Sequence, residues 1–576
     1  MISQTDRQTD RQTDRQTGYP SVDKPWLKYY ERALDDSDIP KCSAYHLLYQ
    51  NNKDYMNDVA LIYFNRKIKF KELFDKIHKT AASLKELGIR KGDVVTLQVL
   101  NMPQVVELFY AISYIGAVAN LIYASASWKE TNEILHRTES KMYITVDFLW
   151  TKQQCAVEGT NVKHILLLGT GEEADGLTKT IIKIKSNAIK NDRCMSWKKF
   201  LEIGKEMPDE INESELPVAM VYTGGTTGKS KAVVLANRSM NALVYQYAYT
   251  YASLQRGETF LNTLPPFIAF GIVFTLHMPL CLGIRNALVT DPAPENAGKY
   301  FCKYQPNYYI CGIAGIDSIM NHKKIKKMNL EFVKVLGAGG EAIPHAFEEK
   351  VNKFLREHKA GTILSIGYGM TEVAATAVTS TPEVHRTGTV GIPLPGTIIK
   401  IVEPDTMKEL SYEQDGEICF CTPTMMLGYY KNEEETDNII RCHADGKRWI
   451  HSGDIGHISE DGFLTVSGRI KRMIATWGEN AYHKVFPQLI EELFAELEGI
   501  NAVTVVGRKT TDVFHELIAF VVLDETHGEE EMLKVLKKTA EEKLDTWEQP
   551  VEYRFMERLP KTAIGKVDYR KLETMV

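Results

Sequence analysis

Apolar residues in the first two-thirds of the chain follow strand-like and helix-like spacings in turn. Runs of strand length occupy residues 60–64, 94–100 and 118–123. Between the first two runs, apolar residues recur at helical spacing from Leu73 to Leu84. Between the second and the third, residues 105–115 are apolar on most sides. The same alternation resumes over 163–236 and 259–375. This pattern predicts an α/β fold with a mainly parallel sheet flanked by helices.

Near residue 395 the pattern changes to short strands separated by polar turns. The expected strands are 398–402, 416–421, 449–450 and 463–466, which indicate a small barrel-like part at about 395–467. A mixed segment follows, with expected helices at 487–497 and 529–544 and expected strands at 502–506, 517–523 and 551–555. We therefore expect an N-terminal domain over 19–468, which includes the barrel-like part, and a small α+β C-terminal domain over 469–576.

The first residues form a repeat rather than a targeting signal. Residues 2–17 repeat Gln-Thr-Asp-Arg, and they have no apolar centre of the kind that a signal peptide needs. We expect residues 1–18 to be a disordered tail. A replication-slippage product and a misplaced start are both open explanations.

Composition narrows the classes of partner. The net charge of −6 and the pI near 6.2 disfavour a nucleic-acid partner, because no segment carries a basic excess. Nine cysteines without a CxxC spacing indicate reduced thiols and a cytoplasmic protein. Cys419 and Cys421 lie on one face of an expected strand, which favours core packing over a metal pair.

One uncharged stretch, 263–284, is long enough to span a bilayer. It is interrupted by polar and helix-breaking residues: Pro265, Pro266, Gly271, His277, Pro279 and Gly283. We expect a buried helix with broken ends beneath a binding cleft, and no membrane span.

The stretch with the clearest ligand-binding signal follows an apolar run at 218–222. It reads Thr223, Gly224, Gly225, Thr226, Thr227, Gly228, Lys229, Ser230 and Lys231. Glycines permit tight turns that aim backbone N–H groups inward, and the hydroxyls and lysines add donors and positive charge, a combination that suits a polyphosphate. The spacing is one residue short of a P-loop. A flexible linker is the alternative, although the flanking apolar run and a possible helix cap at Asn237 or Ser239 disfavour it.

Gly337 to Ala342 fits Gly-x-Gly-x-x-Ala, the dinucleotide-binding fingerprint, after an expected strand at 332–336. An oxidoreductase would also need an acid at the end of the next strand, to hold the ribose. That strand, at 362–366, runs instead into Gly367-Tyr368-Gly369-Met370-Thr371-Glu372. An NAD-dependent enzyme is therefore a distant alternative.

Taken in order, five motifs resemble the adenylate-forming superfamily, which comprises acyl- and aryl-CoA synthetases, luciferases and the adenylation domains of peptide synthetases. The resemblance covers residues from about 45 to 573. The motifs are Tyr222–Gly228, Gly339-Gly340-Glu341, Tyr368–Glu372, Ser452-Gly453-Asp454 with Gly468-Arg469, and Lys566 in Leu-Pro-Lys-Thr-x-x-Gly-Lys. Their order and spacing are more specific than any single motif.

The resemblance implies that a carboxylate attacks the α-phosphate of ATP, a reaction between two anions that needs electrostatic stabilisation. It assigns Thr223, Gly224, Gly225, Thr226, Thr227, Gly228 and Lys231 to the β- and γ-phosphates. Glu372 would hold Mg²⁺ and Thr371 would contact the α-phosphate. Lys566 would bridge the incoming carboxylate and the α-phosphate, as the catalytic lysine.

For the nucleoside, the resemblance places Gly339, Gly340 and Glu341 beside adenine and Tyr368 in a stack upon it. Asp454 would accept both ribose hydroxyls, with Arg469 beside it. Two-step members reorient their C-terminal domain between adenylation and thioester formation, and Lys471 falls at the hinge position. Gly478 matches the glycine that admits the pantetheine arm of CoA or of a carrier protein.

Several positions depart from the family pattern. Gly224, Ser230 and Ala232 are mild changes, whereas Ile268 replaces a histidine that borders the acyl pocket in many acyl-CoA synthetases, and Ala475 replaces a lysine after the hinge. The Ile268 change favours a more apolar pocket or a different gate. No Asp lies near 267–270 to pair an α-amino group, so amino-acid activation is disfavoured.

We therefore expect an AMP-forming ligase that uses ATP and Mg²⁺ to activate a fatty or aryl acid as acyl-AMP and then transfers the acyl group to CoA. The nearer alternative is a stand-alone adenylation enzyme that loads a carrier-protein phosphopantetheine thiol. A degenerate member that only binds nucleotide is a third possibility, against which the presence of Lys566, Glu372 and Asp454 argues.

Replacing Lys566 separates the two half-reactions. Lys566→Ala is expected to lower the adenylation rate by two to three decades, or roughly 3 kcal/mol, because one transition-state donor is lost. Thioester formation from supplied acyl-AMP should persist. Pyrophosphate exchange and thioester assays measure the two steps, and an equal loss in both would contradict a lysine that serves adenylation alone.

Overall fold

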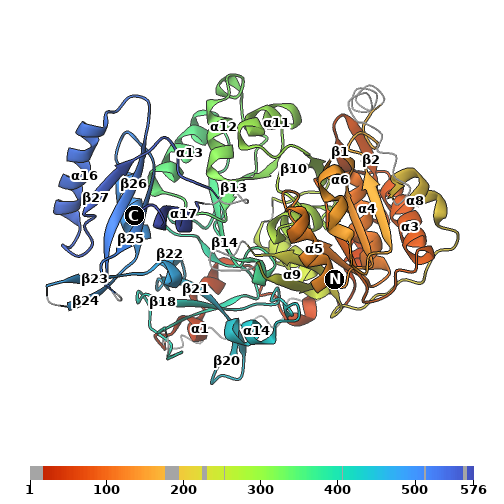
Figure 1. Cartoon of the computed structure of the whole chain (residues 1–576), viewed down its shortest axis with the longest axis horizontal. Helices are drawn as coiled ribbons and strands as arrows, with labels where there is room; N and C mark the ends of the chain where they lie inside the picture. Colours follow the sequence, from red (N-terminus) through yellow and green to blue (C-terminus); the bar gives the residue numbers. More distant parts are fainter. Residues whose placement is uncertain are drawn as a thin grey trace, which may run out of the picture.

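The computed structural model describes residues 17–175, 194–223, 230–251, 253–404, 406–479, 481–511, 514–561 and 567–576. Two large sheets, a smaller antiparallel sheet and a C-terminal group of strands build the molecule (Figure 1). The predicted α/β fold class, with a barrel-like part and a small α+β C-terminal part, is confirmed. Almost all of the tail expected to be disordered lies outside the described residues.

The first large sheet has eight strands and carries both ends of the glycine-rich loop. In spatial order its strands are β19 (Gly428–Tyr429), β9 (Ala232–Ala236), β8 (Pro217–Tyr222), β4 (Val118–Leu121), β3 (Val94–Gln98), β5 (Met142–Val146), β6 (His164–Leu168) and β7 (Cys194–Ser196). The strands from β8 to β7 run parallel, whereas β9 and β19 are antiparallel to their neighbours.

The second large sheet has nine strands. In spatial order they are β16 (Ile392–Pro393), β15 (Val378–Thr379), β14 (Leu364–Tyr368), β13 (Val335–Gly339), β12 (Tyr308–Ile310), β10 (Thr259–Asn262), β11 (Arg285–Leu288), β1 (Val59–Tyr63) and β2 (Arg66–Lys69). The pairs from β14 through to β1 are parallel, and the antiparallel pairs lie at the two edges.

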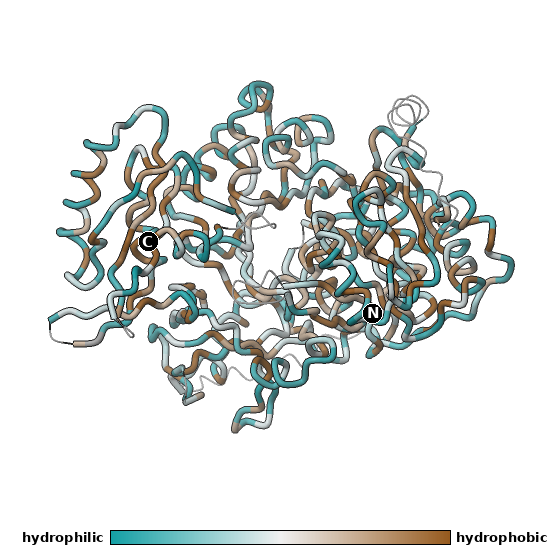
Figure 2. Tube along the Cα trace, in the orientation of Figure 1, coloured by the Kyte–Doolittle hydropathy of each residue, from teal (hydrophilic) through white to brown (hydrophobic). Residues whose placement is uncertain are grey.

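Helix α4 (Pro103–Tyr114) explains how these sheets share one core. Every residue of α4 is buried, as expected for a segment that is apolar on most sides. Oε1 of its Glu107 lies 3.5 Å from Nζ of Lys76 in α3 (Phe70–Glu86), and burial raises the pKa of the Glu107 carboxyl to about 8. The largest hydrophobic cluster includes α4 and strands from both sheets. In Figure 2 the hydrophobic colour follows the strands, whereas outer helices such as α16 (Glu529–Lys543) alternate with hydrophilic residues.

The barrel-like part is a five-stranded antiparallel sheet. Its strands are β17 (Ile398–Val402), β18 (Gly416–Cys421), β21 (Arg448–Ile458), β20 (Ile440–Cys442) and β22 (Leu464–Arg469). The C-terminal part contains the hairpin β23 (Ile474–Gly478) and β24 (Ala481–Val485), the sheet of β25 (Ile500–Lys509), β26 (His515–Leu523) and β27 (Glu552–Phe555), and the helices α15 (Pro487–Ala495), α16 and α17 (Tyr569–Glu573).

Two local predictions are wrong. The strand expected at 332–336 lies at Val335–Gly339, so Gly337 and Gly339 belong to β13 instead of forming a loop after it. A Cβ at Gly337 would lie 2.5 Å from Ile310, and one at Gly339 would lie 2.5 Å from the Gly367 carbonyl oxygen. These glycines permit close strand packing, which removes the structural basis of the dinucleotide fingerprint.

The expected helix cap at Asn237 or Ser239 is also wrong. Helix α9 (Asn237–Thr250) begins at Asn237, and its N-cap residue is Ala236. The Asn237 side chain accepts a hydrogen bond from the Ala44 amide at 2.9 Å, and the Ser239 hydroxyl donates to the Met425 carbonyl at 2.7 Å. Both side chains therefore join distant segments.

The uncharged stretch at 263–284 forms a buried π-helix, η4 (Phe270–His277), followed by α10 (Met278–Cys281). Gly271 through His277 are all buried, so the expected buried helix is confirmed. None of the described helices is long and apolar enough to cross a bilayer.

Adding a methyl group at Gly339 tests the close packing of β13 and β14. Gly339→Ala is expected to destabilise the protein by about 1–3 kcal/mol, because the new Cβ meets backbone. Thermal or urea unfolding measures the change. Gly361→Ala is the matched control, since its Cβ would have no neighbour within 4 Å and its φ is not positive. Equal stability of Gly339→Ala and the parent protein would contradict the packing argument.

Candidate active site

The glycine-rich loop leaves β8 and re-enters at β9, and its two ends are tied together. The Thr223 amide donates to the Lys231 carbonyl at 3.1 Å, and the Ser230 hydroxyl donates to the Thr223 carbonyl at 2.6 Å. The residues predicted to line the loop itself, Gly224, Gly225, Thr226, Thr227 and Gly228, lie outside the described residues. Both ends of the loop are therefore placed at the edge where β8 turns into β9.

Lys231, at the end of this loop, belongs to a chain of polar contacts. Its ammonium group forms an ion pair with Glu435 of α14 (Glu433–Ile439) and lies 4.7 Å from the centre of the Tyr429 ring. The Tyr429 hydroxyl donates a 2.6 Å hydrogen bond to Oε1 of Glu372. The predicted phosphate lysine and the predicted metal carboxylate are thus connected through one tyrosine.

Glu372 is buried, and this shapes its acidity. Burial raises the pKa of its carboxyl group, an effect that the Tyr429 hydrogen bond and the charges of Arg469 and Lys231 only partly offset. Its backbone carbonyl accepts from the Met426 amide at 2.9 Å, which ties the turn to the segment before β19. A buried carboxylate of this kind is poised to accept a cation.

The turn that carries Thr371 and Glu372 has an unusual backbone. It forms the 3₁₀ turn η7 (Thr371–Val373), after which Ala374 and Ala375 adopt φ values of +57° and +129°. A Cβ on Gly369 would lie only 2.3 Å from the Ala375 carbonyl oxygen. Strained non-glycine residues persist where the surrounding structure fixes them, and they cluster at functional sites.

A second group of polar side chains surrounds Asp454. The Tyr368 hydroxyl donates to its Oδ2 at 2.8 Å, and Nε of Arg469 donates to its Oδ1 at 2.5 Å. Asp454 and Arg469 face each other in the register of β21 and β22. The negative charge of Asp454 raises the pKa of the Arg469 guanidinium further. The charge of Arg469 also acts on Glu372, where it partly offsets the effect of burial on the pKa, so this group adjoins the Lys231–Tyr429–Glu372 chain.

Other predicted residues lie apart from these contacts. Gly339 pairs with Gly367 at the end of β13, and Gly340 has a φ of +81°. Glu341 is exposed, and its Oε1 accepts a 2.8 Å hydrogen bond from the amide of Ile313, the first residue of α12 (Ile313–Asn321). In this structure Glu341 therefore caps a helix.

The predicted hinge and pantetheine positions lie in the C-terminal part. Lys471 is exposed in the turn η8 (Ile470–Arg472). Gly478 ends β23 beneath an indole, and a Cβ there would lie 2.7 Å from the Cβ of Trp547. Lys566 lies outside the described residues.

The sequence did not predict that Tyr429 and Glu435 belong to the site. Tyr429 follows Glu372 by 57 residues, and Glu435 follows Lys231 by 204 residues. Neither separation carries a periodic signal, and a tyrosine that ends a strand is common. The association of β19 with β9 brings both residues to the loop.

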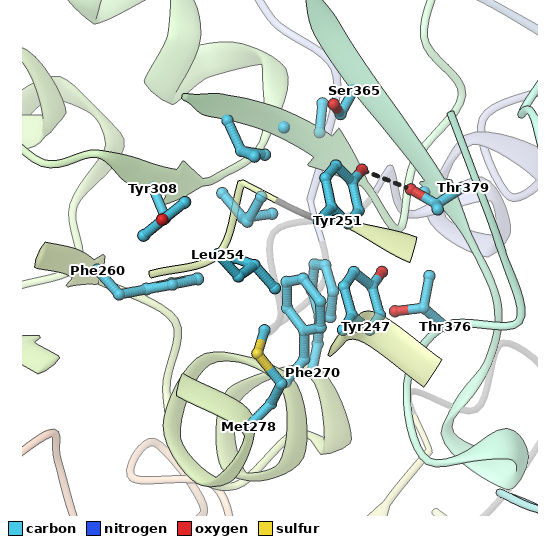
Figure 3. Close-up of a pocket in the computed structure, with 16 residues that line it drawn as sticks. Tyr247, Tyr251, Leu254, Phe260, Phe270, Met278, Tyr308, Ser365, Thr376 and Thr379 are labelled. Carbon is cyan, nitrogen blue, oxygen red and sulfur yellow. Dashed lines mark hydrogen bonds between the residues drawn. The ribbon is translucent and has the colours of Figure 1, made fainter. Parts of the chain in front are cut away.

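An apolar pocket is lined by residues of η4, β13 and β14, among others (Figure 3). The rings of Tyr251 and Tyr247 are stacked 5.8 Å apart, Tyr247 meets Phe274 edge-on at 4.6 Å, and Phe274 stacks on Phe270 at 4.9 Å. The lining also includes Phe260, Tyr308 and small residues of β13 and β14, and no charged side chain is among the described residues that line it. Gly367 lines the pocket and immediately precedes Tyr368, so the pocket adjoins the polar groups.

The burial of Glu372 predicts a pH-dependent cost to stability. The folded-state pKa lies above the ordinary value of 4.5, so the unfolded chain releases this proton more readily. Native stability should therefore fall as pH rises above that ordinary value. Glu372→Gln keeps the Tyr429 contact without the charge, and it is expected to raise the melting temperature at pH 7 but not at pH 4.

Glu435→Gln is the control, because the pKa of Glu435 shifts in the opposite direction to that of Glu372. The hydrogen bond with Lys231 lowers the pKa of Glu435, so this substitution should not stabilise the protein at pH 7. Calorimetric melting temperatures across this pH range measure both variants. A destabilised Glu372→Gln at neutral pH would show that the carboxylate is fully compensated.

Comparison with known proteins places these groups in a family. The family model for AMP-binding enzymes matches residues 48–430, and the model for the AMP-binding enzyme C-terminal domain matches 489–566. A long-chain-fatty-acid–CoA ligase of Salmonella typhimurium is 27% identical over 534 residues, which cover 90% of this chain and 92% of the relative. A probable 4-coumarate–CoA ligase of Dictyostelium discoideum is 26% identical over 520 residues, which cover 87% and 88%.

Among solved structures, an anthranilate CoA ligase in complex with anthranoyl-AMP has a TM-score of 0.79 at 21% identity, and the match covers 94% of this chain and 99% of that one. A benzoate CoA ligase from Burkholderia xenovorans has a TM-score of 0.78 at 18% identity, with 92% and 99% covered. These structures share the fold. The chain belongs to the AMP-binding enzyme family, in the adenylate-forming superfamily of acyl-CoA synthetase-like ligases.

Proposed function

We propose that this protein is an AMP-forming acid–CoA ligase, which activates an apolar carboxylic acid with ATP as acyl-AMP and then transfers the acyl group to CoA. The observation that carries the proposal is the meeting of three groups: the buried Glu372 with Tyr429 and Lys231, the Asp454 group, and the uncharged pocket. Together they provide for phosphates, ribose and an apolar acid at adjoining places.

Each polar group has a role in the first step. Lys231 neutralises charge on the phosphates as pyrophosphate leaves, together with the loop 223–228 and Thr371. Asp454 accepts the ribose hydroxyls, and Tyr368 and Arg469 hold its carboxylate in place. Lys566 bridges the carboxylate and the α-phosphate. Preorganised charges of this kind stabilise the transition state without reorganising during the reaction.

Glu372 fits a magnesium ion. A buried carboxylate with a raised pKa gains from a nearby cation, and carboxylate and phosphate oxygens are the ligands that Mg²⁺ prefers. Tyr429 and the backbone contact from Met426 hold the side chain in place for this role. When bound, the ion would supply positive charge that offsets the negative charge of the phosphates.

The pocket favours an uncharged acyl group. Six aromatic rings and the bare backbone of Gly337 and Gly367 offer apolar surface, so burial of a fatty or aryl group there is favourable. A second charge on the acid would be buried without a partner, at a cost of several kcal/mol. The relatives named as fatty-acid and aryl CoA ligases support the same two classes.

A carrier-protein phosphopantetheine is the second candidate acceptor, because it presents the same thiol arm as CoA. Gly478 is the residue proposed to lie beside that arm, and Lys471 is the proposed hinge. Thioester formation with free CoA, compared with formation on a phosphopantetheinylated carrier, distinguishes the two acceptors.

Pyrophosphate exchange into ATP tests the proposed activity. The protein is expected to show exchange that depends on Mg²⁺ and on an apolar acid, in a panel of fatty, aryl, dicarboxylic and amino acids. Lys231→Ala should reduce exchange by on the order of 100-fold or more, since it removes a phosphate donor. Lys229→Ala, which changes a lysine two residues away, should lose much less. Absence of exchange with every acid would reject the activity.

A further inference from the structure

A row of buried polar side chains crosses one face of the five-stranded sheet. Glu417 of β18 is 9% exposed, His451 of β21 is 5% exposed, and His443, just after β20, is 8% exposed. None of these residues takes part in the proposed chemistry. Buried polar groups are costly unless they are hydrogen-bonded, so their partners show what holds them there.

The three side chains form a continuous hydrogen-bond chain. Oε2 of Glu417 lies 2.8 Å from Nδ1 of His451, and Nε2 of His451 lies 2.9 Å from Nε2 of His443. The Glu417 carboxylate accepts from Nδ1 of His451, and with the His451 ring neutral its Nε2 accepts from His443. Burial lowers the pKa of His443 to about 4, which keeps this ring neutral. Burial raises the pKa of Glu417, but the bond from His451 lowers it below its ordinary value overall.

One end of this chain reaches the Asp454 group. The second oxygen of Glu417 accepts a 3.1 Å hydrogen bond from the Gly453 amide. Gly453 has a φ of +70°, a left-handed conformation that glycine adopts without strain, and the next residue is Asp454. The Glu417 carboxylate therefore fixes the peptide that aims the Asp454 side chain.

The other end is anchored in the hairpin between β20 and β21. His443 is stacked with the Trp449 ring at 5.6 Å, and Nε1 of Trp449 donates to Asp445 at 3.1 Å. The Lys400 ammonium group pairs with Asp445 at 2.8 Å and lies 4.4 Å from the centre of the Trp449 ring. The chain thus connects a rigid hairpin to the Asp454 turn.

A metal site is the competing interpretation of this cluster. Cys419, His443 and His451 offer ligand atoms within 4.8 Å of one another, the one such group found among the described residues. However, both nitrogens of His451 already have partners, one at each end of the ring. The positive charges of Lys400 and Arg441 also act on Cys419 and His443, which disfavours a further cation.

We propose that Glu417, His451 and His443 are positioning residues, which hold the Gly453–Asp454 turn in the conformation that receives the ribose hydroxyls of the nucleotide. This inference rests on the proposed role of Asp454 in ribose binding. It does not depend on which acid or acceptor the protein uses.

Nucleotide binding to the full-length protein provides the test. Titration calorimetry with ATP and with 2′,3′-dideoxyATP measures how much the ribose hydroxyls contribute, and the parent protein should prefer ATP by about tenfold or more. His451→Leu breaks the hydrogen-bond chain and should remove most of this preference, mainly by lowering the affinity for ATP. His451→Gln can donate to Glu417 and accept from His443, so it should restore the preference.

Cys419→Ala is the matched control. Cys419 lies opposite His451 in the register of β18 and β21 and is fully buried. Its Sγ lies 3.5 Å from Nδ1 of His451, but it does not connect His451 to Glu417 or to His443. It should keep the preference for ATP. If His451→Leu does not fold, His443→Phe removes only the distal link and should lower the preference by a few-fold.

Three results would overturn the inference. They are an unchanged preference in folded His451→Leu or His443→Phe, an equal loss in Cys419→Ala, and a parent protein that does not distinguish the two nucleotides. One equivalent of zinc in the purified protein, lost in both Cys419→Ala and His451→Leu, would favour the metal site instead. The binding assay needs no acid, so a failure of pyrophosphate exchange would reject the proposed activity while leaving this inference standing.

Discussion

The ion pair between the buried Asp454 and the half-exposed Arg469 is the interaction on which the arrangement of the candidate site depends. Asp454 belongs to the long strand of the five-stranded sheet, Arg469 ends the strand at which the C-terminal part begins, and Tyr368 comes from the nine-stranded sheet. One carboxylate therefore fixes three parts of the molecule relative to one another. Losing Arg469 would leave the buried Asp454 carboxylate without its cation, which is costly in a protein interior.

The candidate site holds two carboxylates that are almost fully shielded from solvent. Glu372 and Asp454 are 5% and 4% exposed, and each depends on a tyrosine hydroxyl and on nearby cations. The strained Ala374 and Ala375 add a backbone cost at the same place. A ligand that brings phosphates and a cation would relieve part of this cost, so binding and stability are linked here.

Much of the fold could be predicted because its signals are local. The expected strands 398–402 and 416–421 match β17 and β18, and the expected helix at 487–497 overlaps α15. β13 was misplaced because glycines have low strand propensity, and only the neighbouring backbones of β12 and β14 explain them. The links from Tyr429 to Glu372 and from Glu435 to Lys231 could not be predicted, since they join segments that meet only after the sheets form. The roles given to the motif residues rest on family resemblance and stay predictions.

The indole of Trp547 over Gly478 has a consequence for the acceptor thiol. Trp547 is stacked on His483 at 3.8 Å, and the His483 ring lies 3.0 Å from the Gly478 carbonyl oxygen. Under the proposed role of Gly478, a pantetheine arm beside this glycine would meet the Trp547–His483 stack and would exchange one set of contacts for another. Only the difference between the two contributes to acceptor affinity, and an aromatic pair of this kind is worth about 0.5–1.5 kcal/mol. The Trp547–His483 stack would then lower the affinity for CoA and for a carrier-protein arm by a similar amount.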